Sequence, residues 1–137
     1  MNKFKEDINF GKISEKEIYE ILKNKYPDIE STSDYSIFDF VSQNQKLNIE
    51  LKTRRNESNK YPTTMIGLNK IKKCNDPDMM YLFIFKFTDE ILFIRYNEEI
   101  FNKFEIKKSG RYDRKKSGEL SNYIYIPITS LSSLENL

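Results

Sequence analysis

The sequence predicts a mixed α/β domain, with helices flanking a central mixed sheet and elements in the order α-β-β-α-β-β. Three patterns predict this class. Apolar residues recur at helical spacing over residues 14–26. Apolar and polar residues alternate over 35–41 and 47–53, and strongly apolar runs occupy 81–87 and 90–96. Helical and strand-like segments therefore share one chain, which favours a sheet covered by helices.

Length and composition predict a single domain spanning residues 1–137. The chain has 137 residues, of which 38% are hydrophobic and 14% aromatic, enough to bury one core. Four Gly and four Pro stand beside ten Phe and nine Tyr, a composition that argues against disorder.

The helical segment at residues 14–26 opens the predicted fold. Ser14 is the expected N-cap, and Glu17 at the third helical position completes a capping box. The apolar stripe that we expect to be buried consists of Ile18, Ile21, Leu22 and Tyr26.

The two alternating runs, YSIFDFV and LNIELKT, are expected to pair as an antiparallel hairpin. Successive side chains point to opposite faces of a strand. A one-residue slip would bring Phe38 and Phe40 beside Glu50 and Lys52, which the hydrophobic pattern disfavours. The allowed registers therefore set Asp39 on the same face as Glu50.

The tightest allowed register turns at Asn44-Gln45 and sets Asp39 directly opposite Glu50. Directly opposed Cβ atoms lie about 4.5–5.5 Å apart. The pattern thus brings two carboxylates together. The other pairs expected in this register are Phe38 with Leu51 and Phe40 with Ile49.

The later segments complete the expected order. Residues 65–73 are expected to form a short helix, and the apolar runs at 81–87 and 90–96 a hairpin that turns at Thr88-Asp89. The remaining expectations are a charged loop over 107–122, a strand over 123–128 and a helical turn within 129–137.

Several residue types are missing, and their absence restricts the chemistry. There is no histidine, which excludes Ser-His and Cys-His triads, and one cysteine cannot build a structural zinc site. Catalysis must use carboxylates, lysines, tyrosines or a hard metal ion bound through oxygen. The lone Cys74 and the absence of a signal-peptide or membrane-spanning run predict an intracellular protein. We expect a cytoplasmic location, or a nucleus or viral factory for a eukaryotic or viral chain.

The predicted acid pair requires a compensating cation. Two unit charges about 5 Å apart repel by roughly 3 kcal/mol at an effective dielectric of 20. Lys52 lies on the same face as Glu50 and supplies part of the charge. A divalent ion bound through oxygen, Mg²⁺ or Mn²⁺, would supply more. The alternative is a solvated polar face with an incidental acid–lysine pair.

Glu15 is a third candidate acid. On the predicted helix it falls near the mean direction of the apolar stripe, whereas Glu20 points nearly opposite. It is therefore expected to face the body of the protein, where an uncompensated charge is costly. The alternative is a first-turn glutamate that interacts with the helix dipole.

These residues resemble those of the PD-(D/E)XK nuclease superfamily, which has the restriction-endonuclease-like fold. Asp39 is followed eleven residues later by Glu50-Leu51-Lys52, and a helix with a glutamate precedes them. Within the superfamily the chain most resembles the Holliday-junction-resolvase-like branch. The matching features are Gly11, followed four residues later by Glu15 and then by Leu22, and the strand IELKTR, and the resemblance covers residues 11–96. Phe38 stands where the superfamily nominally has proline.

The resemblance implies a metal-dependent endodeoxyribonuclease. By this resemblance Asp39, Glu50 and the Leu51 backbone carbonyl bind Mg²⁺ or Mn²⁺, and Glu15 assists directly or through water. Lys52 orients or activates the attacking water and stabilises charge on the phosphorane. Junction-resolving relatives act as two-fold dimers, so we expect a homodimer, with the two aromatic strands as interface.

Basic residues are the candidates for binding DNA. The net charge of +2 says little by itself, but several cations follow the second strand and others crowd the charged loop. The alternative is a solvated lysine-rich face. The candidates are Arg54, Arg55, Lys60, Tyr61, Lys70, Lys107, Lys108, Arg111, Arg114, Lys115 and Lys116.

Three hypotheses about function follow. The first is a structure-specific endonuclease that acts on branched DNA in recombination or repair. The second is a restriction, repair or nicking nuclease of the same fold. The third is a non-catalytic nucleic-acid-binding module, against which the presence of the aspartate, glutamate and lysine of the motif argues.

Overall fold

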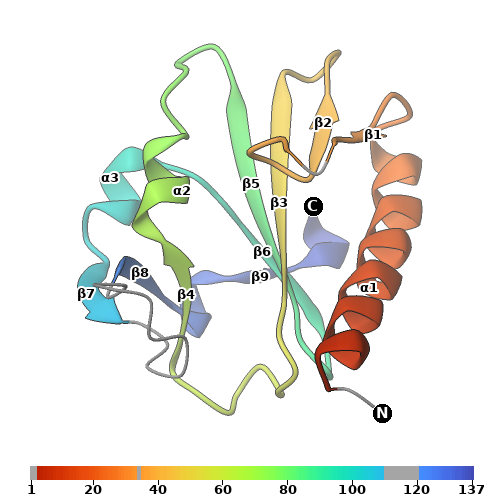
Figure 1. Cartoon of the computed structure of the whole chain (residues 1–137). Helices are drawn as coiled ribbons and strands as arrows, with labels where there is room; N and C mark the ends of the chain where they lie inside the picture. The colour runs from red at the N-terminus through yellow and green to blue at the C-terminus, as the bar shows by residue number, and fades with distance from the viewer. Residues whose placement is uncertain (1–2, 34, 110–120) are drawn as a thin grey trace.

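A computed structural model gives the structure of the chain and describes residues 3–33, 35–109 and 121–137. Within these residues a six-stranded mixed sheet has the spatial order β1-β2-β3-β5-β6-β9, and a smaller sheet has the order β4-β8-β7 (Figure 1). Strands β3 and β5 run parallel, and the other neighbours in the larger sheet run antiparallel. The predicted fold class, a mixed sheet flanked by helices, is confirmed.

The elements have the following bounds. The larger sheet consists of β1 (Glu30–Ser31), β2 (Phe40–Ser42), β3 (Leu47–Thr53), β5 (Met80–Lys86), β6 (Ile91–Arg95) and β9 (Ser132–Ser133). The smaller sheet consists of β4 (Thr63–Gly67), β7 (Glu105–Ser109) and β8 (Ser121–Pro127). The helices are α1 (Lys3–Lys25), α2 (Leu68–Lys72) and α3 (Glu98–Phe101), and two 3₁₀ turns are η2 (Ile128–Ser130) and η3 (Leu134–Asn136).

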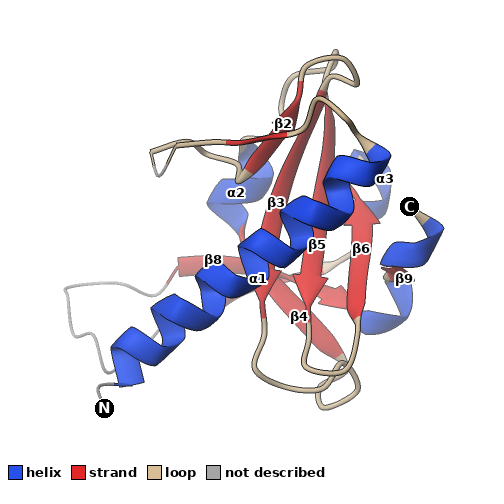
Figure 2. Ribbon diagram, turned by 90° about the vertical axis from the view of Figure 1, so that its right-hand side faces the viewer, coloured by secondary structure: helices blue, strands red, loops and turns tan. Residues whose placement is uncertain are grey.

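Two apolar clusters cover the two faces of the larger sheet. Helix α1 crosses one face obliquely (Figure 2) and packs there against β2, β3 and β5. The smaller sheet, α2 and α3 cover the other face. Because side chains alternate along a strand, Leu82 and Ile84 of β5 join the α1 cluster, whereas Phe83 and Phe85 join the opposite one. None of the described helices is long and apolar enough to cross a membrane.

Helix α1 begins earlier than predicted. It starts at Lys3, so Ser14 lies inside the helix, fully buried, and the predicted capping box is wrong. The backbone before Ser14 is itself helical. Its carbonyl groups accept the N–H groups that a cap would have to satisfy at a helix start. Lys86 instead contacts this region, with its Nζ 3.3 Å from Ser14 Oγ and 2.9 Å from a Glu17 carboxylate oxygen. Of the predicted apolar stripe, Ile18, Leu22 and Tyr26 are buried, and Ile21 is 41% exposed.

The predicted register of the first hairpin is confirmed, but the first strand is shorter than predicted. Phe40 pairs with Ile49, as expected from a turn at Asn44-Gln45, and the Asp39 N–H donates to the Ile49 carbonyl at 2.9 Å. Residues 35–39 bend instead of forming a strand, so the alternation of side chains stops before β2. Phe38 therefore packs in the cluster opposite α1, 5.3 Å from the Tyr81 ring, and does not pair with Leu51.

The later segments are confirmed in part. The hairpin of β5 and β6 is confirmed, and its turn is closed by the Phe87 N–H donating to the Glu90 carbonyl at 2.9 Å. The late strand is confirmed as β8, and the helical turn near the C-terminus as η3. The predicted helix over 65–73 is wrong at its start, because residues 65–67 belong to β4. The charged loop was predicted too long: β7 extends to residue 109, and residues 110–120 lie outside the described part.

The aromatic strands do not provide the predicted dimer interface. Phe83 and Phe85 of β5 and Leu92, Phe93 and Ile94 of β6 are all buried inside the chain. Their apolar side chains stabilise the core and are not available to a second subunit.

Candidate active site

The bend before β2 and the middle of β3 together place two carboxylates. One oxygen of Asp39, Oδ2, accepts the Leu51 N–H at 2.8 Å. In an antiparallel pair the N–H and C=O of one residue point to the same neighbouring strand. The Leu51 carbonyl therefore faces the edge at which Asp39 lies. This arrangement gathers oxygen atoms of Asp39 and of the backbone at residue 51.

Glu50 is the buried acid of the site. It lies on β3, is only 4% exposed, and points to the face opposite α1, since its neighbours Leu47 and Ile49 pack in the α1 cluster. Its two oxygens have different partners. Lys52 Nζ lies 3.1 Å from Oε2, and Lys70 Nζ lies 3.4 Å from Oε1. A single buried carboxylate thus contacts two ammonium groups.

The pKa of Glu50 is raised above its ordinary value. Burial is the main cause and the negative charge of Asp39 the second, while Lys52 and Lys70 oppose both. The ionised form of Glu50 therefore needs positive charge close by. The effect of Asp39 on Glu50 shows that the two carboxylates lie close enough to repel each other, as the predicted register implies, although Asp39 itself precedes the strand.

Lys52 lies on the same face as Glu50, as the alternation of β3 predicted. Its side chain is 34% exposed, whereas that of Glu50 is 5% exposed. The ammonium group therefore contacts the buried acid and is still accessible to a ligand in solvent.

Lys70 is the site residue whose place the sequence did not reveal. It was a candidate only for contacting phosphate, yet α2 brings it to Glu50. Its Nζ also donates to the Ile37 carbonyl and lies 5.5 Å from the centre of the Phe38 ring. A helix of five residues has too few turns for its periodicity to indicate which side chain faces β3.

Glu15 is not brought to the same point. In the described part of the chain no three His, Cys, Asp or Glu side chains gather as metal ligands, and Glu15 therefore forms no such group with Asp39 and Glu50. It lines a shallow pocket with Lys16, Tyr19 and Ser31. The physical reason is that α1 covers one face of the sheet while Glu50 points to the other. A role for Glu15 at the ion, directly or through water, stays a prediction.

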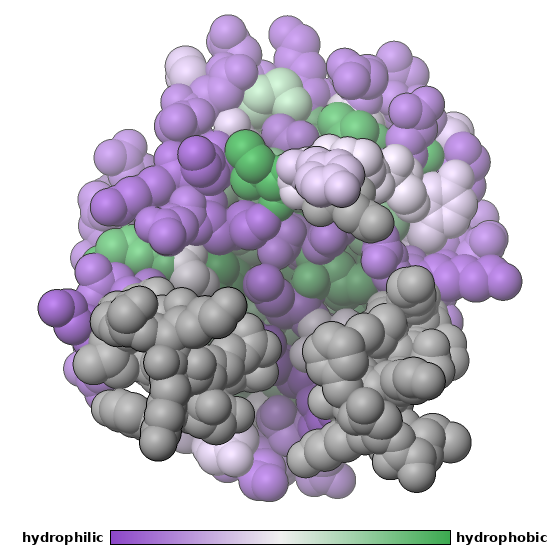
Figure 3. Space-filling model, viewed as in Figure 1, coloured by the Kyte–Doolittle hydropathy of each residue, from purple (hydrophilic) through white to green (hydrophobic). Residues whose placement is uncertain are grey.

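The predicted DNA-binding residues have different surroundings. The face seen in Figure 3 is mostly hydrophilic, with apolar patches between the polar side chains. Arg55, Lys60, Lys107 and Lys108 are exposed, as is Tyr61, which lies under the Lys60 ammonium with 5.6 Å between Nζ and the ring centre. Lys107 lies 3.4 Å from a Glu105 oxygen. Candidates outside the described residues are Arg111, Arg114, Lys115 and Lys116.

Arg54, one of the predicted DNA-binding residues, makes hydrogen bonds within the fold. Its Nη2 donates to the Met65 carbonyl at 2.7 Å, and its Nε to Thr64 Oγ1 at 3.3 Å. Burial lowers the pKa of the guanidinium below its ordinary value. The side chain thereby joins the end of β3 to β4 of the smaller sheet.

Replacing Arg54 with alanine is expected to lower the free energy of unfolding by about 2 kcal/mol, because charged hydrogen bonds between the two sheets are lost. Urea unfolding followed by circular dichroism measures this change. The control is Lys72→Ala, at an exposed position on α2. A variant as stable as the wild type, with weaker DNA binding, would instead support the predicted contact between Arg54 and DNA.

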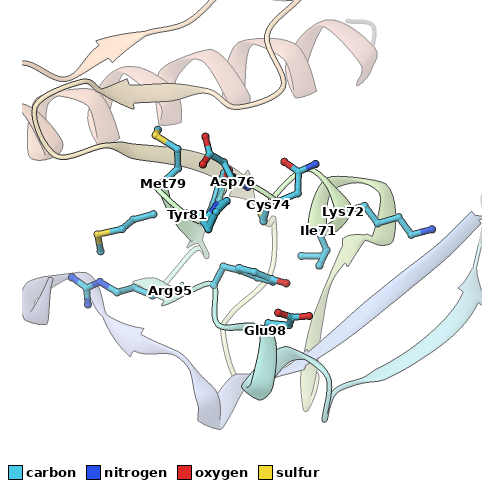
Figure 4. A pocket seen from close by; sticks show the side chains of 12 residues that line it. Ile71, Lys72, Cys74, Asp76, Met79, Tyr81, Arg95 and Glu98 are labelled. Atoms are coloured by element: carbon cyan, nitrogen blue, oxygen red, sulfur yellow. Dashed lines mark hydrogen bonds between the residues drawn. The ribbon is translucent and has the colours of Figure 1, made fainter.

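A cavity of about 590 Å³ lies beside α2, and the acid pair does not line it. Figure 4 shows Cys74, Asp76, Tyr81, Arg95 and Glu98 around it. Burial raises the pKa of the Cys74 thiol to about 12, so this cysteine is not a thiolate nucleophile at neutral pH. The candidate chemistry therefore belongs to the carboxylates and lysines around Glu50.

Comparison with known proteins identifies the family of the chain. The family model described as "Phage putative PDDEXK endonuclease" matches residues 7–134. This segment contains both carboxylates and both lysines of the site. Searches of curated proteins and of solved structures each gave no match.

Proposed function

Since the chain belongs to this family of phage PDDEXK endonucleases, we propose that it is a Mg²⁺-dependent endonuclease that hydrolyses phosphodiester bonds in DNA. Membership of the PD-(D/E)XK superfamily agrees with the resemblance noted in the sequence. The observation that carries the proposal is the arrangement of Asp39, Glu50 and Lys52 around one point of β3. Two acids of the motif are electrostatically coupled there, and the lysine of the motif lies 3.1 Å from the buried one.

The donor set suits a hard divalent cation. Asp39, Glu50 and the Leu51 carbonyl offer only oxygen atoms, which Mg²⁺ and Mn²⁺ prefer. Burial and the negative charge of Asp39 raise the pKa of Glu50, and a cation bound nearby would favour its ionised form. When bound, the ion would polarise the phosphate and lower the pKa of a water molecule.

Lys52 is the residue that acts on the substrate in this proposal. Its partly exposed ammonium group can contact a phosphate oxygen and stabilise the negative charge that develops as water attacks phosphorus. Contact with Glu50 fixes the position of the amine before the substrate binds. A positioned charge of this kind costs little reorganisation during the reaction.

The finer assignment is a structure-specific nuclease, similar to Holliday-junction resolvases, that acts as a homodimer on branched DNA. It rests on the resemblance of the first helix and of the strand IELKTR. A restriction, repair or nicking nuclease of the same fold is the alternative. The choice depends on which DNA is cut, because both classes use the same acids and lysine.

The test uses the purified full chain with labelled linear, nicked, flapped and four-way DNA, in Mg²⁺ or in EDTA. Cleavage in Mg²⁺ and none in EDTA is expected, with four-way DNA cut fastest. Equal cleavage of linear DNA would favour the second class of nuclease. DNA binding without cleavage of any substrate in Mg²⁺ or Mn²⁺ would contradict the proposal and favour a non-catalytic binding module.

A further inference from the structure

Lys70, the second lysine in contact with Glu50, bears on how many metal ions the site binds. Lys70 Nζ lies 3.4 Å from Oε1 of Glu50, and Lys52 Nζ lies 3.1 Å from Oε2. The side chain of Lys70 is 24% exposed, less than the 34% of Lys52. The two ammonium groups thus occupy different oxygens of one carboxylate, and Lys70 is the deeper of the two.

Three groups hold the Lys70 ammonium in place. Besides Glu50 it contacts the Ile37 carbonyl and lies 5.5 Å from the centre of the Phe38 ring. The buried neighbour Ile71 anchors α2 against the core. A carboxylate, a carbonyl and an aromatic face are all groups that attract a cation. The segment that leads to Asp39 and the strand that carries Glu50 thus meet at one fixed positive charge.

The charges around the site balance for one divalent ion. Asp39 and Glu50 are cancelled by Lys52 and Lys70. The two positive charges of one divalent ion are then balanced by the single negative charges of a phosphodiester and of a hydroxide. A second divalent ion would leave an excess of two positive charges, and the described part of the chain brings no third acid to this point.

We propose that Lys70 takes the place of a second metal ion, so that the centre binds one divalent cation. Asp39 and Glu50 would hold the ion, and the ammonium of Lys70 supplies permanent positive charge at Oε1 of Glu50. The inference rests on the proposed function, because it needs Asp39 and Glu50 to bind the ion. It adds the number of ions and a role for a lysine outside the motif.

The consequence is that removing this charge has opposite effects on two measurements. Lys70→Met keeps a side chain of similar length against Phe38 but removes the positive charge. Divalent ions should then bind more tightly, because a like charge near them is gone. Cleavage should be slower, because negative charge in the transition state loses a compensating cation. A purely structural role would weaken ion binding and slow cleavage together.

The test is calorimetric titration of the full chain with Mn²⁺ at pH 8, combined with single-turnover cleavage. Wild-type protein is expected to bind one Mn²⁺ per chain. Lys70→Met is expected to bind Mn²⁺ at least about tenfold more tightly and to cleave at least about tenfold more slowly. The matched control is Lys72→Met, an exposed lysine of the same helix, which should change neither quantity.

Each other outcome separates the inference from the proposed function. Two Mn²⁺ per wild-type chain, both lost in Asp39→Asn, would overturn the inference and leave the nuclease proposal intact. Weaker Mn²⁺ binding by a folded Lys70→Met would overturn it as well, as would unchanged affinity. If wild-type protein binds no Mn²⁺, the proposed metal centre fails and the inference fails with it. The wild-type stoichiometry decides the number of ions even if Lys70→Met does not fold.

Discussion

Replacing Asp39 with asparagine is expected to lower Mg²⁺-dependent cleavage of DNA by at least about a hundredfold while the protein stays folded. The asparagine carbonyl can still accept the Leu51 N–H that Asp39 accepts at 2.8 Å, so the bend before β2 is retained. What is lost is one negative charge at the ion. Removing that charge also relieves its repulsion with Glu50, so stability should not fall.

Single-turnover cleavage, Mn²⁺ calorimetry and circular dichroism measure these effects. The matched control is Asp28→Asn, because Asp28 also accepts a backbone N–H, that of Asn44 at 2.9 Å, but lies near the turn of the hairpin. The control should cleave at the wild-type rate. Wild-type cleavage by Asp39→Asn would show that the reaction does not use this carboxylate.

Replacing Lys52 with methionine is expected to lower cleavage by at least about a hundredfold with little loss of metal binding. Methionine keeps the length of the side chain but has no ammonium group to contact the phosphate. Glu50 keeps Lys70 at its other oxygen, 3.4 Å away, so the buried carboxylate is not left without a cation. Metal ligands are unchanged, and the loss should appear in the chemical step.

The two lysines at Glu50 can be separated in this way. Lys52→Met and Lys70→Met both slow cleavage, but Lys70→Met is expected to tighten Mn²⁺ binding more, by about tenfold or more, because Lys70 is the less exposed charge. Lys72→Met again serves as the control for both. A Lys52→Met variant that cleaves as fast as the wild type would remove the lysine of the motif from the mechanism.

The register that brings Asp39 close to Glu50 could be predicted because it depends on local rules. Period-two alternation and the need to keep Phe40 away from the polar face of β3 allow few registers, and the observed pairing of Phe40 with Ile49 is the tightest of them. The same reasoning was wrong for Phe38, since the chain bends before β2 and alternation holds only within a strand.

The predicted capping box was wrong because a local pattern was interpreted without the residues that precede it. A serine followed by glutamate three residues later indicates a helix start only if the preceding chain is not helical. Here α1 already runs through residues 3–13, and Ser14 is buried within it. The smaller sheet was missed because β4 is short and continues directly into α2 at Gly67.

The residue pattern alone was enough to predict a mixed sheet, to exclude histidine chemistry, and to identify an aspartate, a glutamate and a lysine spaced for one face of a hairpin. Long-range packing is what places Lys70 at Glu50 and lets Arg54 join the two sheets. Hairpin pairing follows from neighbouring residues and their alternation. The position of a helix against a strand depends on how distant apolar side chains fill a common core, which no short pattern encodes.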